Sequence, residues 1–144
     1  MMRILLIFLA IASASAAKAQ DARSQLFHAH SLKCHFGAGT TTRWKGNGPN
    51  TAPAKDEQDV QFDSIDLKRR RARVIGNIGA SDVDAIASPV GITFIESKQA
   101  VFGTTTVFAI LAAPDEYLAV DSRHVLFMDT VAAEQYPGTC RVWQ

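Results

Sequence analysis

The sequence contains only two cysteines, and they stand near opposite ends of the chain. Cys34 lies in the segment LKCHF, and Cys140 lies in the segment GTCRVW. A bond between them would close a loop of about 100 residues, for which the chain-entropy model gives a stabilisation of roughly 4.7 kcal/mol. It would also tie the first folded segment to the last, so any fold of this chain must bring these two segments side by side.

The first residues, MMRILLIFLAIASASAAKAQ, indicate the compartment in which the cysteines meet. Arg3 precedes an apolar run at 4–12, which has the length of a signal-peptide core and is too short to span a bilayer. The small residues at Ala17 and Ala19 fit a signal-peptidase site. We therefore predict a signal peptide at 1–19, cleavage after Ala19, a single domain at 20–144, and a periplasmic or secreted protein with no later transmembrane segment.

An exported chain reaches an oxidising compartment, where thiols pair. We therefore predict a disulfide between Cys34 and Cys140, the only pairing that two cysteines allow. Two alternatives are a metal-binding thiolate pair and a cysteine nucleophile assisted by His35. Both need reduced sulfur in a compartment that removes it, so the disulfide is favoured and no cofactor is predicted.

The charge of the chain excludes a general attraction to polyanions. The formal net charge is +1, and loss of Arg3 and Lys18 with the signal peptide makes it slightly negative. A near-neutral protein is not drawn as a whole to nucleic acid or to a membrane surface. No nucleic-acid partner is expected, and any charged partner must bind a local patch.

Alternating apolar residues predict strands throughout the chain. In the first cysteine segment, Leu32, Cys34 and Phe36 fall on one face and leave Lys33 and His35 on the other. Similar short segments recur every 8–12 residues between Gly, Pro and Asp, which is typical of barrels and sandwiches. The segments are SLKCHF, GAGTTTRW, VQFDSIDL, ARVIGNIG, SDVDAIAS, GITFIES, VFGTTTVFAIL, YLAVDSRHVLF and TCRVW. We predict an all-β fold, a small antiparallel barrel or sandwich of about eight strands closed by one disulfide.

Four further segments carry local predictions. The polar stretch 20–29 suggests a loose N-terminus, and 45–59, rich in Gly and Pro, predicts a loop. Phe62 and Ile65 are an odd number of residues apart, so they would face opposite sides of a regular strand, and a β-bulge is indicated between them. The segment 130–138 suggests a single helical turn.

A strongly basic run at 67–73 is the first candidate binding site. Its cationic residues are Lys68, Arg69, Arg70, Arg71 and Arg73. Such a run can bind phosphate, lipid headgroups or acidic polysaccharide, and hence an anionic envelope component. No aromatic residue interrupts it to stack on bases. The alternative is an exposed hairpin tip or edge, where charge prevents strands of different molecules from pairing.

The histidines are the candidate metal ligands. They are His28, His30, His35 and His124. The first two would share one side of an extended segment, and imidazole is a common ligand. However, His35 would point the opposite way, His124 is remote in sequence, and no Cys or Glu completes a known spacing. No metal site is predicted.

The segment Asp121-Ser122-Arg123-His124 contains the residue types of a hydrolase triad. On a strand, Ser122 and His124 would share one face, and Asp121 and Arg123 would share the other. The hydroxyl and imidazole would then lie too far apart to bond, and no G-x-S-x-G turn surrounds the serine. We predict a surface or cross-strand ion pair between Asp121 and Arg123, and no catalytic residue.

Three smaller features remain. The segment 76–79, GNIG, lacks the ending of a phosphate loop and predicts a turn. Glu96 closes an apolar segment and fits either an inward carboxylate or a strand end. The larger aromatics could line a cavity, although in a small β domain they more often fill the core; they are Trp44, Tyr117, Tyr136 and Trp143.

Several segments together resemble a group of small exported proteins of proteobacteria. They are IDL, ARVIGNIG, GITFIE, TTVFA, AV-x-SRHV and QYPGTC, spread between Ile65 and Cys140. The resemblance implies export and a compact β fold. It implies no catalytic residue and no function for the chain.

The favoured function is a non-enzymatic binding or interaction module. It would hold a small apolar ligand inside a barrel, which needs about eight strands, or an anionic partner along Lys68–Arg73. One alternative is a metal-dependent hydrolase, which would gather the histidines and Glu96 within about 4 Å around a cleft. Another is a purely structural envelope protein, with a filled core and one exposed patch or open strand edge.

Overall fold

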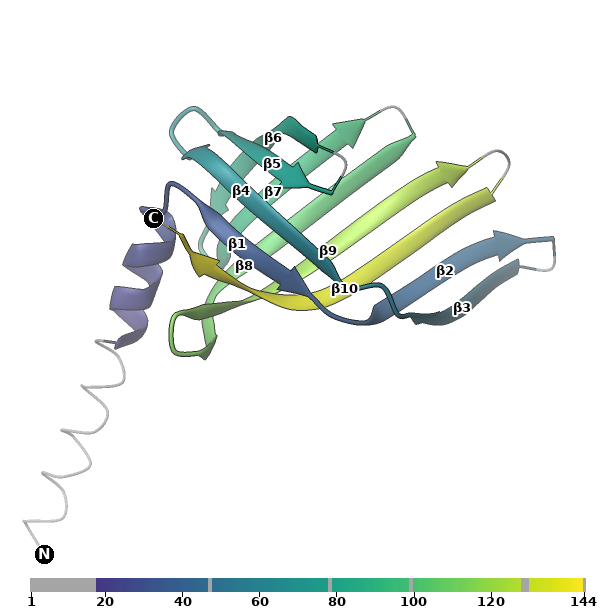
Figure 1. Ribbon diagram of the computed structural model, residues 1–144, viewed down its shortest axis with the longest axis horizontal. Coiled ribbons are helices and arrows are strands. Elements are labelled where there is room, and N and C mark those ends of the chain that lie inside the picture. Colours follow the sequence, from purple (N-terminus) through teal and green to yellow (C-terminus); the bar gives the residue numbers. More distant parts are fainter. Residues whose placement is uncertain (1–17, 47, 78, 99, 128–129, 144) are drawn as a thin grey trace, which may run out of the picture.

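The computed structural model describes one helix and ten strands (Figure 1). Most of the expected signal peptide lies outside the described residues. The described residues are 18–46, 48–77, 79–98, 100–127 and 130–143. The helix covers 18–27. The strands are β1 (Leu32–Phe36), β2 (Gly39–Lys45), β3 (Gly48–Ala54), β4 (Gln58–Asp66), β5 (Arg71–Gly76), β6 (Gly79–Ser88), β7 (Gly91–Lys98), β8 (Val101–Ala113), β9 (Glu116–Phe127) and β10 (Thr130–Val142).

The strands form one antiparallel sheet that closes on itself. Its order is β1-β4-β5-β6-β7-β8-β9-β10-β2-β3, and a further pairing of β1 with β10 closes the ring. The β2–β3 hairpin lies outside this ring, so the other eight strands make the barrel. The predicted all-β fold of about eight strands is confirmed, and the barrel is the correct alternative.

The apparently complex strand order is a simple meander. β1 and β2 pair in succession with the same edge of β10, at Phe36↔Gly138 and then Thr40↔Gln135. β4 and β3 pair in the same way with β1 and β2. When β1–β2 and β3–β4 are each taken as one interrupted strand, all neighbours are consecutive in the chain. This is the connectivity of an up-and-down barrel.

The disulfide joins the first and last strands of the barrel. Cys34 of β1 lies directly opposite Cys140 of β10 in the antiparallel register, and the two sulfur atoms are bonded. The prediction from export and cysteine number is therefore confirmed. The bond lies at the seam where the sheet closes.

Inward and outward side chains alternate as the sequence pattern predicts. Leu32, Cys34 and Phe36 are buried, whereas His35 between them is exposed. The buried residues of the other barrel strands join the same core. Because every strand contributes alternate side chains, the barrel has one continuous interior.

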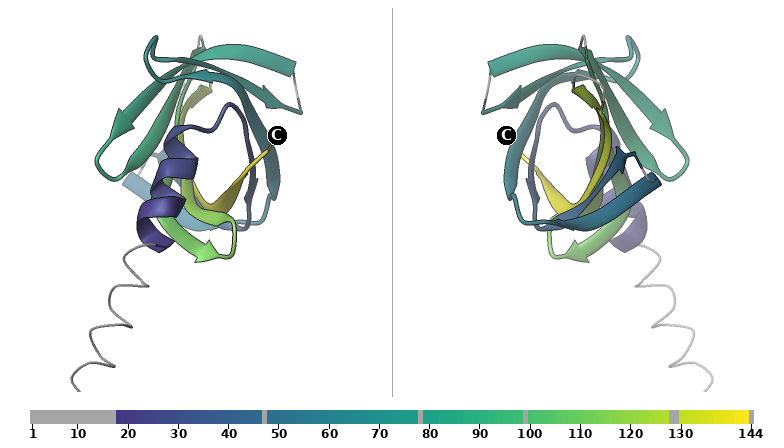
Figure 2. Two further views of the ribbon diagram at one scale, coloured as in Figure 1. Left: turned by 90° about the vertical axis from the view of Figure 1, so that its left-hand side faces the viewer. Right: turned by 90° about the vertical axis from the view of Figure 1, so that its right-hand side faces the viewer.

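The helix at 18–27 covers one end of the barrel (Figure 2). Ala22, Leu26 and Ala29 are buried in the core, at the spacing of one helical face. The Tyr117 hydroxyl donates a hydrogen bond of 2.7 Å to the Ala22 carbonyl oxygen. The expected loose N-terminus at 20–29 is therefore wrong, because these few apolar residues suffice to dock a short helix. No helix among the described residues is long and apolar enough to cross a membrane.

The expected loop at 45–59 is also wrong, because it contains β3 at Gly48–Ala54. β3 pairs only with β2, and the hairpin extends away from the barrel (Figure 1). Pro49 and Pro53 have the same parity, so the backbone atoms of both point to one side of the strand. A proline nitrogen has no hydrogen to donate, and an unpaired edge tolerates it.

The other two local predictions have opposite outcomes. The bulge between Phe62 and Ile65 is confirmed: the β4–β5 register shifts there, Ser64 has a φ of 52°, and both apolar neighbours are buried. The helical turn expected at 130–138 is wrong, because β10 is continuous through it. Pairing with β9 along nearly its whole length overrides the local preference for a turn.

Candidate functional site

The two ends of the barrel differ. The helix closes one end, at the left of Figure 1. The opposite end, where β5, β7 and β9 end and β6, β8 and β10 begin, contains a cavity of about 480 Å³. Inward side chains from all strands from β4 to β10 line this cavity. We call it the open-end cavity.

The floor of the open-end cavity is apolar. The rings of Phe62 on β4 and Phe94 on β7 are stacked, with centroids 3.9 Å apart and an angle of 12° between their planes. Val74 and Val83 line the same region. Both phenylalanines are almost fully buried. An apolar group that entered the barrel would therefore meet an aromatic and aliphatic surface.

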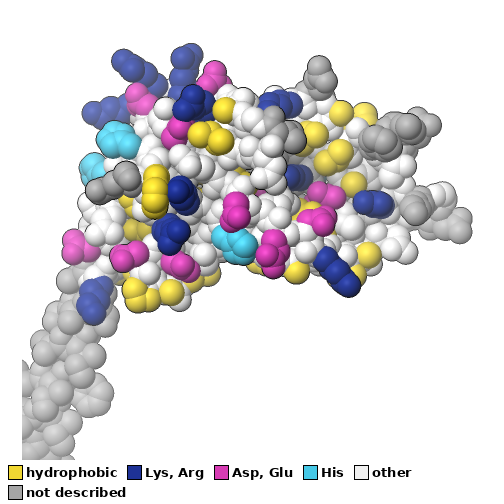
Figure 3. All heavy atoms as spheres, viewed as in Figure 1, with side chains coloured by type: hydrophobic (Ala, Val, Ile, Leu, Met, Phe, Trp, Pro, Cys, Tyr) yellow, Lys and Arg dark blue, Asp and Glu magenta, His cyan; other side chains and the backbone are white. Residues whose placement is uncertain are grey.

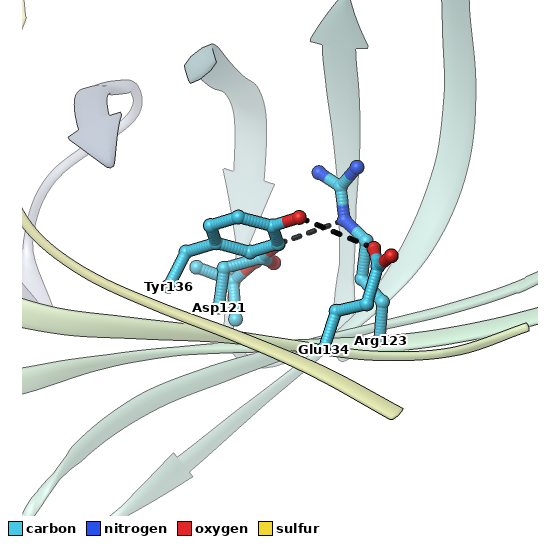
Figure 4. Close-up of polar contacts among 5 residues, drawn as sticks. Asp121, Arg123, Glu134 and Tyr136 are labelled. Carbon is cyan, nitrogen blue, oxygen red and sulfur yellow. Dashed lines mark hydrogen bonds and ion pairs between the residues drawn. The ribbon is translucent and has the colours of Figure 1, made fainter. Parts of the chain in front are cut away.

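One wall of the cavity contains a partly buried ion pair. Asp121 and Arg123 are alternate residues of β9, and both face inward (Figure 4). The Asp121 carboxylate accepts a hydrogen bond of 2.7 Å from the Thr105 hydroxyl and one of 2.8 Å from Nε of Arg123. The Asp121 side chain is 5% exposed and that of Arg123 is 34% exposed. The pair is therefore anchored at the carboxylate and accessible at the guanidinium.

A second carboxylate, Glu134 of β10, lies beside this pair (Figure 4). It accepts hydrogen bonds of 3.3 Å from the hydroxyls of Tyr136 and Thr41. Burial raises the pKa of the Tyr136 phenol, and the adjacent charge of Glu134 raises it further. The phenol therefore stays protonated at neutral pH and acts as a donor to the carboxylate.

The part of the wall on the other side of β8 from Arg123 is formed by Glu96 and Lys98 of β7. Glu96 accepts a hydrogen bond of 3.0 Å from the Ser81 hydroxyl and lies 3.1 Å from Nζ of Lys98. Gly103 on β8 is paired with Glu96 on one side and with Arg123 on the other. A Cβ atom there would lie 3.9 Å from Cγ of Arg123. The glycine therefore leaves room for a Cβ atom between the two charged side chains, at ordinary contact distance.

A larger hollow, of about 770 Å³, lies on the outer surface of the barrel. Most of its side chains belong to outward positions of β1, β4 and β10, such as Lys33, Gln61 and Arg141. It has no apolar floor comparable to the Phe62–Phe94 pair. The open-end cavity combines an apolar floor with oriented polar groups, as ligand sites usually do, so it is the better candidate despite its smaller volume.

The basic run occupies the β4–β5 turn and the start of β5, at the helix-covered end, where Figure 3 shows a group of Lys and Arg side chains at the upper left. The run is thus an exposed hairpin tip, which was the alternative to an anion-binding site. Arg73 binds the Asp63 carboxylate with hydrogen bonds of 2.9 and 2.7 Å and holds the pKa of that carboxyl below its usual value. Nη1 of Arg69 lies 3.6 Å from Asp66.

These carboxylates reduce the positive charge of the run. Arg71 is also paired across the strands with Asp84. Lys68 and Arg70 are exposed and make no ion pair within the described part of the chain. Anion binding by this run stays a prediction.

The structure does not bring the histidines together. His35 lies on the outer surface, with Nδ1 2.9 Å from Asp59, and this contact raises the pKa of its imidazole. His124 stacks on the exposed Phe102 at 6.3 Å between ring centroids. His28 bonds to the backbone of the helix. Among the described residues, no three His, Cys, Asp or Glu side chains are arranged to hold a metal ion.

The alternation predicted for residues 121–124 is confirmed, since Asp121 and Arg123 share a face and form an ion pair. The predicted surface or cross-strand position of this pair is wrong in both forms, because the two residues belong to the same strand and their face is the barrel interior. Glu96 is an inward carboxylate. The turn predicted at 76–79 joins β5 to β6, where Gly79 has a φ of 119° that favours glycine.

The expectation that large aromatics fill the core holds for the tyrosines only. Tyr117 and Tyr136 are buried, whereas Trp44 and Trp143 are 47% and 44% exposed. Thr105 and Glu134 were not predicted from the sequence as residues of a site. They could have been found because each lies an even number of residues from a buried residue of its own strand and so faces inward, as Glu134 does with Tyr136.

Comparison with known proteins adds no assignment. No family model matches the sequence, and no curated protein matches it.

Proposed function

We propose that this protein is an exported, non-enzymatic binding module that holds a small, largely apolar ligand in the open-end cavity. The observation that carries the proposal is the cavity itself, about 480 Å³ in volume, with the stacked Phe62 and Phe94 at its floor. Sites for small molecules typically have volumes of about 300–1,000 Å³, with mostly apolar walls and a few oriented polar groups.

The polar groups of the cavity support binding rather than catalysis. Asp121 is held between Thr105 and Arg123, and Glu134 accepts two hydroxyl donors. Each group is bonded to a neighbour that fixes its orientation. Among the described residues that line the cavity there is no histidine, the side chain that most often serves as a general base.

Three features support export. The disulfide between Cys34 and Cys140 is compatible with an oxidising compartment. The N-terminal sequence fits a signal peptide at 1–19. The segments between Ile65 and Cys140 resemble exported proteins of proteobacteria. Such a protein would carry or sequester its ligand outside the cytoplasm.

The proposal is tested with N-phenyl-1-naphthylamine, an uncharged apolar probe that fluoresces in apolar surroundings. We expect one probe to bind per chain. Gly103→Leu should abolish this binding, because its side chain would fill the space beside Arg123 while Cβ makes only ordinary contacts. Gly37→Leu is the matched control, since a Cβ there meets nothing within 4 Å and Gly37 lies between β1 and β2, outside the cavity.

A second variant protects the test against misfolding. Val125→Phe also narrows the cavity, from β9. Both cavity variants should unfold cooperatively yet lose the probe, whereas Gly37→Leu should bind it as the original protein does. Absence of probe binding to the original protein, or equal binding by both folded cavity variants, would overturn the proposal.

A further inference from the structure

The charges inside the open-end cavity do not balance. Both cations that line it are already paired with a carboxylate. Nε of Arg123 donates to Asp121 at 2.8 Å, and Nζ of Lys98 lies 3.1 Å from Glu96. These two pairs together carry no net charge. The charge of the cavity therefore depends on the remaining inward carboxylate.

That carboxylate is Glu134. Its two oxygens accept hydrogen bonds from the hydroxyls of Tyr136 and Thr41, and neither donor carries a positive charge. Within the described ranges, Glu134 makes no ion pair. Hydroxyl donors stabilise an ionised carboxylate without neutralising it. Arg123 lies directly opposite Glu134 in the β9–β10 register, but its Nε donates to Asp121, so Glu134 is the third inward carboxylate of a cavity that contains two cations.

The rim of the cavity adds to this charge. Asp56 and Glu57, in the link between β3 and β4, are exposed and line the same opening. Besides burial, the charges of Glu134 and Asp56 raise the pKa of the Tyr136 phenol and the charge of Arg123 lowers it, so all three charges act on the same region. Aligned charges at the mouth of a low-dielectric cleft concentrate the field there. A positively charged ligand would be attracted into the opening.

We propose that the open-end cavity selects an amphipathic amine, whose ammonium group binds Glu134 and whose apolar body lies against Phe62 and Phe94. This inference rests on the proposed function and specifies its ligand class. The ammonium would supply a third cation, beside Glu134, to a cavity with three inward carboxylates and two cations. The aromatic floor would accept the remaining apolar part, and an aromatic face also attracts a cation near it.

The guanidinium of Arg123 is the strongest argument for a ligand of opposite charge. Its Nη atoms point away from the labelled carboxylates in Figure 4 and could donate to an anion. An anion bound there would lie near Asp121, which accepts from Nε of the same group, and near Glu134. The inward carboxylates outnumber the inward cations, so the cavity favours a cation.

Three probes with the same ring system separate these possibilities. They are 1-naphthylmethylamine, 1-naphthalenemethanol and 1-naphthoate, measured by titration calorimetry at pH 7. We expect the amine to bind about tenfold more tightly than the alcohol, as for one charge-assisted hydrogen bond, and the carboxylate to bind least. The advantage of the amine should shrink as salt is added.

Glu134→Gln isolates the proposed contact, because the amide oxygen can still accept from Tyr136 while the charge is removed. The amine should then bind no more tightly than the alcohol, and the affinity for the alcohol should stay within about twofold. Glu134→Asp retains the charge and should keep most of the preference. Asp115→Asn, at the β8–β9 turn of the opposite end, removes the same charge and should change neither affinity.

Equal binding of amine and alcohol, tighter binding of the carboxylate, or an amine preference that survives Glu134→Gln in a folded variant would overturn the inference. The proposed function would stand in each of these cases, since a ligand still enters the cavity. If none of the three probes and no N-phenyl-1-naphthylamine binds, both proposals are wrong.

Discussion

The helix-covered end and the open end of this barrel are made by the same strands but differ in the side chains that point inward. On β9, the inward residues near the helix are Tyr117 and Ala119, and those toward the opening are Asp121 and Arg123. On β10, Cys140 lies in the core and Glu134 lines the cavity. The inward faces of both strands thus change from apolar residues near the helix to charged residues in the cavity.

The comparison separates the residues that hold the fold together from those that form the site. The disulfide, Leu26 of the helix and the Tyr117 hydrogen bond all lie toward the helix-covered end. The open end is held by β-ladder pairing and by polar contacts such as Thr105 with Asp121. Stability concentrated at one end lets the other expose charged groups and an unfilled interior.

Among changes at the two ends, loss of the disulfide should have the largest effect on the free energy of unfolding. Replacing Cys34 and Cys140 by alanine should lower the free energy of unfolding by about 4 kcal/mol, because the long loop regains freedom in the unfolded chain. Urea unfolding of the two proteins measures the difference. An unchanged midpoint would show that the β1–β10 seam needs no covalent closure.

Leu26→Ala should have the next largest effect, a loss of about 3 kcal/mol. The side chain is fully buried where the helix meets the core, so the substitution leaves a cavity there. Gln25→Ala, an exposed site on the same helix, is the control and should change stability little. Equal, small losses in thermal unfolding would mean that the helix does not close the barrel.

At the open end, Thr105→Val should cost about 1.5 kcal/mol. The substitution keeps the shape of the side chain and removes the hydrogen bond to the buried Asp121 carboxylate. Thr104→Val, one residue away on the outward side of β8, is the matched control. A loss as large as that of Leu26→Ala would contradict the division between a stabilising end and a functional end.

The two tyrosines report on the two ends separately. Burial raises the pKa of both phenols; near Tyr117 the further contribution comes from Asp115, and near Tyr136 from Glu134. Absorbance titration, assigned with Tyr117→Phe and Tyr136→Phe, should show both ionising above the unfolded value of about 10. Their protonated state stabilises the fold below pH 10, and this contribution is lost as the pH rises through the folded pKa values.

Glu134→Gln should lower the pKa of Tyr136 and leave that of Tyr117 unchanged. A shift of both, or of neither, would show that the phenols do not sense separate environments.

Much of the fold could be predicted from sequence because alternation is a local signal. The strand faces, the β4 bulge and the disulfide follow from residue spacing and cysteine number. The helix at 18–27 and β3 could not, since their stability comes from partners distant in sequence. Pro49 and Pro53 indicate a loop until the structure shows an edge strand with one free side.

The site was harder to predict than the fold. Spacing places Asp121 and Arg123 on one face, but polar residues on an inward face look like those on an outward face. Only closure of the sheet shows that this face encloses a cavity. The basic run at 68–73, conspicuous in sequence, is interleaved in space with Asp63, Asp66 and Asp84.

Native mass spectrometry of the protein purified from its own host tests the central claim most directly. We predict one small bound mass per oxidised chain, released on denaturation and absent from Gly103→Leu prepared in the same way. Gly37→Leu should retain it. A bare chain in every preparation, or an added mass that Gly103→Leu retains, would contradict a ligand held in the open-end cavity.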